Sequence, residues 1–183
     1  MPNDNLKKLY VDELKDLFSA ENQLLKALPK MANAASSDEL RTGFEKHLEQ
    51  TKIHIQRLEE IFESLHESPK GKKCVGMEGL VKEGSEVMEE GFEDALLDAG
   101  LICAARRVEH YEMAAYGAAC EIAKVLGETQ HESLLKKTLA EEKQADEKLS
   151  DLANEITSQA NEDKSDEQRD SLRAGKKKQK HAA

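Results

Sequence analysis

The sequence predicts an all-α fold, in which four long helices form a bundle and one long connection carries a short fifth helix. The 183 residues include only 10 Gly and 3 Pro, too few to punctuate a sheet of many strands. Apolar residues recur every three or four positions over long stretches, which is the period of an amphipathic helix. Charged residues make up 35% of the chain and aromatic residues 4%, a composition typical of long helices.

The apolar repeats predict five helices, over approximately residues 5–35, 36–65, 77–90, 92–126 and 129–161. Pro29 should kink the first helix or end it locally. Ser36 and Glu39 have the spacing of a capping box, so we expect the second helix to begin there. Gly127 is the expected C-terminal cap of the helix that ends at Leu126.

The lengths of the connections predict how the helices are ordered. The turns inside the first and last pairs of long helices are short, so each pair should form an antiparallel hairpin. The Pro/Gly/Lys-rich segment 67–76 and the short helix then form the crossover between the hairpins. This is the topology of a ferritin-like four-helix bundle. We expect residues 1–161 to form the bundle and residues 162–183, which lack an apolar period, to form a disordered charged tail.

Charge and cysteine content exclude several classes of function. The formal net charge of −10 argues against a nucleic acid or an anionic membrane as the main partner, apart from weak contacts by the basic end of the tail. The N-terminus has no apolar signal region, and no apolar stretch is long enough to span a membrane. The 3 cysteines form no zinc motif, and Cys103 and Cys120 lie too far apart on one helix for a disulfide. We therefore expect reduced thiols in a cytoplasmic protein.

The most informative feature is a set of polar residues on the apolar faces of the helices. At 100° per residue, five acidic residues point inward from three helices, namely Glu21, Glu109, Glu112, Glu142 and Asp146. The second helix contributes His47, Thr51 and His54 to its inner face. A buried carboxylate is costly unless it is paired or binds a metal, so these residues indicate a cation inside the bundle.

We therefore predict two iron or manganese ions, because oxygen-rich ligands with some histidine suit these metals. The predicted ligands are Glu21, His54, Glu109, Glu112, Glu142 and Asp146. The match to the usual motif is partial, since Thr51 stands where a Glu-x-x-His sequence would place its glutamate. The sequence leaves open whether His47, Thr51 or Glu49 completes the site.

The inward acids also have an interpretation without metal. Arg106 and Arg107 are available as salt-bridge partners for the neighbouring Glu109 and Glu112. Tyr116, one turn after Glu112, is either a hydrogen-bond donor to a carboxylate or an ordinary core aromatic. Under this interpretation the protein is a helical scaffold or interaction module.

Several segments carry a resemblance to a known family over about residues 5–155. They are YVDELKDLFSAENQLLKALPKMA, HLEQT, CVGMEGL, VEHYEMAAYG and the region LAEEKQADEKLSDLA. In these segments the chain resembles the YciE/YciF-type stress-response proteins of bacteria, a ferritin-like family. The resemblance implies a ferritin-like bundle, a homodimer and a metal-binding potential like that of rubrerythrins, whose third helix also carries a Glu-x-x-Glu.

The likeness to rubrerythrins supports Glu21, Glu109, Glu112 and Glu142, but it supplies no ligand at Thr51. It implies a role in the stress response and establishes no reaction. The leading hypothesis is a cytoplasmic di-metal protein that oxidises iron or consumes peroxide. The alternative hypothesis is a metal-free scaffold of the stress response.

Overall fold

The computed structural model describes the backbone of residues 2–180 and the side chains of residues 4–160. It confirms the predicted all-α class, since the described residues form helices and no strand. The helices are α1 (Pro2–Ala34), α2 (Asp38–Leu65), α3 (Val75–Glu89), α4 (Asp94–Leu126) and α5 (Thr129–Lys180).

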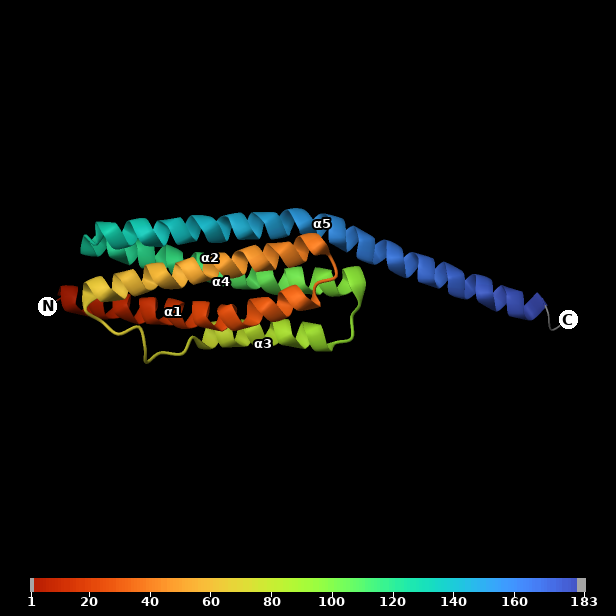
Figure 1. Cartoon of the computed structure of the whole chain (residues 1–183), viewed down its shortest axis with the longest axis horizontal. Helices are drawn as coiled ribbons and strands as arrows, with labels where there is room; N and C mark the ends of the chain where they lie inside the picture. The colour runs from red at the N-terminus through yellow and green to blue at the C-terminus, as the bar shows by residue number, and fades with distance from the viewer. Residues whose placement is uncertain (1, 181–183) are drawn as a thin grey trace.

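The four long helices α1, α2, α4 and α5 run side by side as a bundle, and α3 lies along its outside (Figure 1). As predicted, α1 packs against α2 and α4 packs against α5, so the chain forms two hairpins. The connection between the hairpins runs the length of the bundle and carries α3, which packs against α1 and α4.

The structure decides between the two alternatives at Pro29 and corrects the start of the second helix. α1 does not end at Pro29 but continues to Ala34, with Leu28 and Met31 on either side of the proline buried in the core. α2 is capped by Ser37 and not by Ser36, since the Ser37 hydroxyl accepts a hydrogen bond from the backbone N–H of Leu40 at 3.3 Å.

The last helix also extends further than the sequence predicts. α5 is helical to Lys180 and projects past the end of the bundle, where we expected a disordered tail from residue 162 (Figure 1). The composition is compatible with a helix, because residues 162–180 contain five Lys and two Arg, which favour helices, and no proline. The side chains of residues 161–180 lie outside the described part of the chain, and the boundary between bundle and tail stays a prediction.

The bundle core consists of two apolar clusters separated by a polar layer. One cluster lies toward the turn between α1 and α2 and includes Leu28, Phe44 and Leu101. The other lies toward the opposite end and includes Leu14, Phe62 and Tyr116. The polar layer between them contains buried acids or histidines from each of the four long helices. The two clusters hold the helices together, so the polar layer does not have to supply the stability of the fold.

A buried aspartate fixes the turn between α1 and α2. Asp98 is 2% exposed, and its two carboxylate oxygens accept hydrogen bonds from the backbone N–H groups of Ser36 and Ser37, at 2.8 and 2.7 Å. Since Asp98 lies on α4, these bonds tie the first hairpin to the second. They also satisfy two backbone donors at the start of α2.

We predict that Asp98→Ala lowers the free energy of unfolding by about 2–3 kcal/mol, because it leaves two N–H groups without their charged acceptor. Urea unfolding followed by circular dichroism measures the change. The exposed Asp151 on α5 offers a matched control, and Asp151→Ala should change stability by less than about 0.5 kcal/mol. Equal stability of the two variants would show that Asp98 does not fix the turn.

Candidate metal centre

The polar layer brings side chains from all four long helices to one place in the bundle. Six acids or histidines, each at most 6% exposed as a whole residue, supply these side chains, namely Glu21 on α1, His47 and His54 on α2, Glu109 and Glu112 on α4, and Glu142 on α5. Each helix turns these residues inward because they lie on the same face as its apolar residues. Two partly overlapping groups form within the layer.

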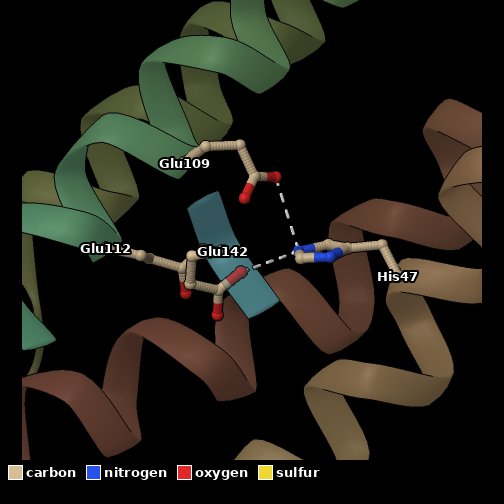
Figure 2. A group of neighbouring side chains, drawn as sticks. All are labelled: His47, Glu109, Glu112 and Glu142. Atoms are coloured by element: carbon tan, nitrogen blue, oxygen red, sulfur yellow. Dashed lines mark ion pairs between the residues drawn. The ribbon is translucent and has the colours of Figure 1, made fainter. Parts of the chain in front are cut away.

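The first group consists of His47, Glu109, Glu112 and Glu142, whose potential ligand atoms all lie within 4.8 Å of one another (Figure 2). The Nε2 atom of His47 lies 3.4 Å from Oε1 of Glu109 and 3.8 Å from Oε2 of Glu142. Neither carboxylate oxygen of Glu112 has a hydrogen-bond partner among the described residues. The group therefore has unsatisfied acceptors that converge on one point.

The second group consists of Glu21, His54 and Glu142, and it meets the same 4.8 Å criterion. The Nδ1 atom of His54 lies 2.9 Å from Oε1 of Glu142 and 3.4 Å from Oε1 of Glu21. Glu142 therefore belongs to both groups and connects them. Carboxylates with one histidine in each group form a ligand set that suits iron or manganese.

Burial and mutual repulsion shift the pKa values of the buried acids and of His47. Burial, reinforced by the charge of Glu142, raises the pKa of Glu109 and of Glu112 well above the ordinary value. Burial also raises the pKa of Glu21, although His54 offsets part of the shift. Burial lowers the pKa of His47. These directions describe a cluster that is short of positive charge when no cation is bound.

His54 departs from this pattern because it has acidic partners on both sides. Burial lowers its pKa, but Glu142 and Glu21 outweigh this effect and raise it to about 10. Its Nε2 atom lies 2.9 Å from Oε2 of Glu141. Arg57 holds Glu141 with hydrogen bonds of 2.6 and 2.9 Å to its two oxygens. This arrangement orients the ring so that Nδ1 faces the buried acids.

Tyr116 acts as a hydrogen-bond donor within the core. Its hydroxyl donates to Oε1 of Glu21 at 2.5 Å, and its side chain is also part of the apolar cluster next to the layer. Burial, followed by the charge of Glu21, raises its pKa, so the hydroxyl keeps its proton. Both interpretations drawn from the sequence therefore apply to Tyr116.

The structure brings together five of the six predicted ligands and leaves Asp146 outside. Asp146 receives hydrogen bonds from Nε and Nη2 of Arg106, at 2.8 and 3.4 Å, and lies 3.4 Å from His110. The guanidinium of Arg106 lowers its pKa, as expected for a surface ion pair. Asp146 lies one helical turn beyond Glu142, which moves it along α5 toward the edge of the layer.

Three residues were left open by the sequence, and the structure places them differently. His47 lies in the first group, whereas Glu49 is exposed and pairs with Lys52. Thr51 is fully buried, and its hydroxyl has no hydrogen-bond partner among the described residues. Glu141, which contacts both His54 and Arg57, is not among the residues predicted from the sequence. The available signal was Arg57, a positive charge one turn after His54 that needs an acidic partner.

The chain matches a known family over residues 5–162, the family described as "Domain of unknown function (DUF892)". The chain belongs to the DUF892 family. Among the curated proteins, it is 44% identical to Protein YciF of Escherichia coli (strain K12) over 149 residues, which are 81% of this chain and 90% of YciF. The resemblance to YciE/YciF-type proteins is thereby confirmed.

Solved structures agree with the DUF892 assignment. The E. coli stress protein YciF is 43% identical, covers 84% of this chain and 97% of its own, and superposes with a TM-score of 0.81. YcfI from Rhodopseudomonas palustris is 39% identical, with a TM-score of 0.77 over 79% of this chain and 92% of its own. A ferritin-like, diiron-carboxylate protein from Bacillus anthracis str. Ames, 19% identical, has a TM-score of 0.63 over 80% of this chain and 96% of its own. The predicted ferritin-like fold is thus confirmed.

Two further features of this DUF892 chain concern membrane-spanning helices and the cysteines. None of the helices in the described part of the chain is both long and apolar enough to cross a membrane. All three cysteines are free thiols, with Cys74 and Cys120 buried and Cys103 exposed.

The raised pKa values predict that the metal-free protein becomes more stable as the pH falls from about 8.5 to about 7.0. For Glu109 and Glu112 the folded pKa lies above the ordinary 4.5, so their stabilising contribution is complete below pH 4.5 and is lost as the pH rises through the folded values. His54 acts in the same direction between its ordinary 6.5 and about 10. His47, with its lowered pKa, opposes the trend mainly at and below its ordinary value of 6.5, so its effect between about pH 8.5 and about pH 7.0 is small.

Thermal melts of chelator-treated protein across this pH range measure the effect. Each proton that only the folded chain holds contributes about 1.4 kcal/mol per pH unit. The double variant Glu109→Gln/Glu112→Gln should have a flatter dependence, because it removes the groups whose pKa is raised. A melting temperature that stays constant or drops on acidification from about pH 8.5 to about pH 7.0 would contradict this account of the cluster.

Proposed function

We propose that this protein binds two iron or manganese ions in the polar layer and acts as a di-metal protein in the bacterial stress response. The observation that supports this proposal is the concentration of four buried carboxylates around two histidines, with carboxylate oxygens that lack hydrogen-bond partners among the described residues. Two imidazoles supply at most two positive charges to four acids. Divalent cations would balance the charge and satisfy the acceptors together.

The two groups define the proposed ligands. His47, Glu109 and Glu112 would hold one ion, Glu21 and His54 would hold the other, and Glu142 would be shared. This arrangement differs from the usual Glu-x-x-His motif on two helices. Here α2 supplies two histidines, at positions 47 and 54, and α4 supplies the pair Glu109-x-x-Glu112.

If bound, two redox-active ions would supply the two electrons that the reduction of a peroxide to two molecules of water requires, together with two protons. The chain's own residues would position and protect this site. Tyr116 holds Glu21 through its hydroxyl, and Glu141 holds His54 through its Nε2 atom. The apolar clusters on both sides exclude bulk water and strengthen each electrostatic contact in the layer.

The names of relatives support a physiological role and also a second candidate. The E. coli relative is described as a stress protein, which supports a stress-response function for this chain. A cytoplasmic location and a homodimer are part of the same proposal and rest on the sequence. The Rhodopseudomonas relative is described as a putative structural protein. The second candidate is therefore a metal-free scaffold, in which His54 neutralises part of the charge of Glu21 and Glu142.

Metal analysis distinguishes the two candidates. We expect about two equivalents of iron or manganese per chain when the protein is purified, without a metal-affinity tag, from cells supplied with these metals. Inductively coupled plasma mass spectrometry measures the content. Less than about half an equivalent of any metal would contradict the di-metal proposal and favour the scaffold.

A single variant should separate binding from folding. Glu112→Gln replaces a fully buried acid whose carboxylate oxygens have no hydrogen-bond partner among the described residues and whose pKa is raised by burial. We therefore expect the metal-free variant to be more stable than the wild type by about 1 kcal/mol or more. The variant should also lose most of the stabilisation that manganese provides, which is about 2.7 kcal/mol at a hundredfold excess over Kd. Calorimetry with and without manganese measures both effects.

The control is Glu49→Gln, because Glu49 lies on α2 with 67% of its side chain exposed. It should change neither the metal-free stability nor the stabilisation by manganese. If Glu112→Gln keeps the full response to manganese, Glu112 is not a ligand.

A further inference from the structure

A small cavity leads from the protein surface to one side of the polar layer. It has a volume of about 60 Å³ and lies between α2 and α5, with Gly43, Lys46 and Lys148 among its exposed lining residues. Its buried lining includes His47 and Glu109 of the first group. A volume of this size accommodates about two water molecules, so it suits a ligand of two or three heavy atoms.

The exposure of the cluster is confined to the residues that line this cavity. The side chains of His47 and Glu109 are 8% and 4% exposed, whereas those of Glu21, His54 and Glu142 are 0% exposed. Both ring nitrogens of His47 and one oxygen of Glu109 lack hydrogen-bond partners among the described residues. The cavity therefore reaches two of the side chains that are proposed to hold the first metal ion.

The charge at the mouth of the cavity is opposite to that of the chain as a whole. The chain carries a net charge of −10, yet the exposed charged residues that line the cavity are Lys46 and Lys148. Lys148 is close enough to act electrostatically on His47, where it disfavours the protonated ring. Two ammonium groups at a narrow opening repel cations and attract anions.

We propose that this cavity is the ligand port of the metal centre, and that Lys46 and Lys148 make it selective for a small uncharged or anionic ligand over a hydrated cation. The inference rests on the proposed function and names the class of molecule that reaches the centre. A peroxide has the required size and charge. A hydrated metal ion does not, so metal would load by another route or during folding.

The test uses azide as the probe, with the 183-residue protein loaded with ferric iron. Azide is anionic, contains three heavy atoms, and gives an absorption band when it binds ferric iron. Gly43→Met should close the mouth, because a Cβ at Gly43 meets no atom within 4 Å and the longer side chain has open space to cover the cavity. We expect azide association at least about tenfold slower than in the wild type.

Gly79→Met on α3 is the matched control, because Gly79 is also an exposed helical glycine with no atom within 4 Å of an added Cβ. It should leave azide association unchanged. The pair Lys46→Gln/Lys148→Gln should slow azide association at least about fivefold at low salt, with the difference shrinking at high salt. Lys137→Gln, at an exposed position on the same helix as Lys148, is its control.

Metal content and the rate of manganese loading are measured for every variant before azide is added. The port is supported if Gly43→Met retains its metal but binds azide slowly. It is overturned if fully loaded Gly43→Met and Lys46→Gln/Lys148→Gln bind azide at the wild-type rate. Absence of metal from the wild type would refute the proposed function itself, a result that the metal measurement distinguishes from failure of the port.

Discussion

The cost of placing four carboxylates in the middle of a helical bundle is the constraint on which the rest of the structure depends. Glu21, Glu109, Glu112 and Glu142 are each at most 3% exposed, and such groups are expensive to bury while charged. The fold tolerates them because an apolar cluster on each side of the layer supplies the packing. Stability and site chemistry are therefore assigned to different parts of the same four helices.

The two sides of the polar layer differ in how firmly neighbouring side chains hold the buried acids and histidines. On one side, Arg57 and Glu141 fix His54, and Tyr116 fixes Glu21, so the second group is closed and oriented. On the other side, His47 lines a cavity and has no hydrogen-bond partner among the described residues. One half of the layer is thus held in place, and the other half is open to a small molecule. This asymmetry fits a centre in which one ion is sequestered and the other is accessible.

Much of the fold follows from the sequence, because long apolar repeats and short turns leave few alternatives. The inward direction of Glu21, Glu109, Glu112 and Glu142 follows from the same period. The helical period does not show that Asp146 differs from these four acids. Asp146 lies outside the layer because it pairs with Arg106, a contact that exists only in the folded bundle. Nor does the period reveal Glu141, whose contact with His54 depends on the packing of α2 against α5.

The most direct test of the central claim is anomalous X-ray diffraction at the iron edge from crystals of the iron-loaded protein. We expect about two anomalous peaks inside the bundle, one beside His47, Glu109 and Glu112 and one beside Glu21 and His54, with Glu142 between them. We expect no peak at Asp146, which Arg106 already neutralises. Iron found only at surface acids, or none within the polar layer, would contradict the account.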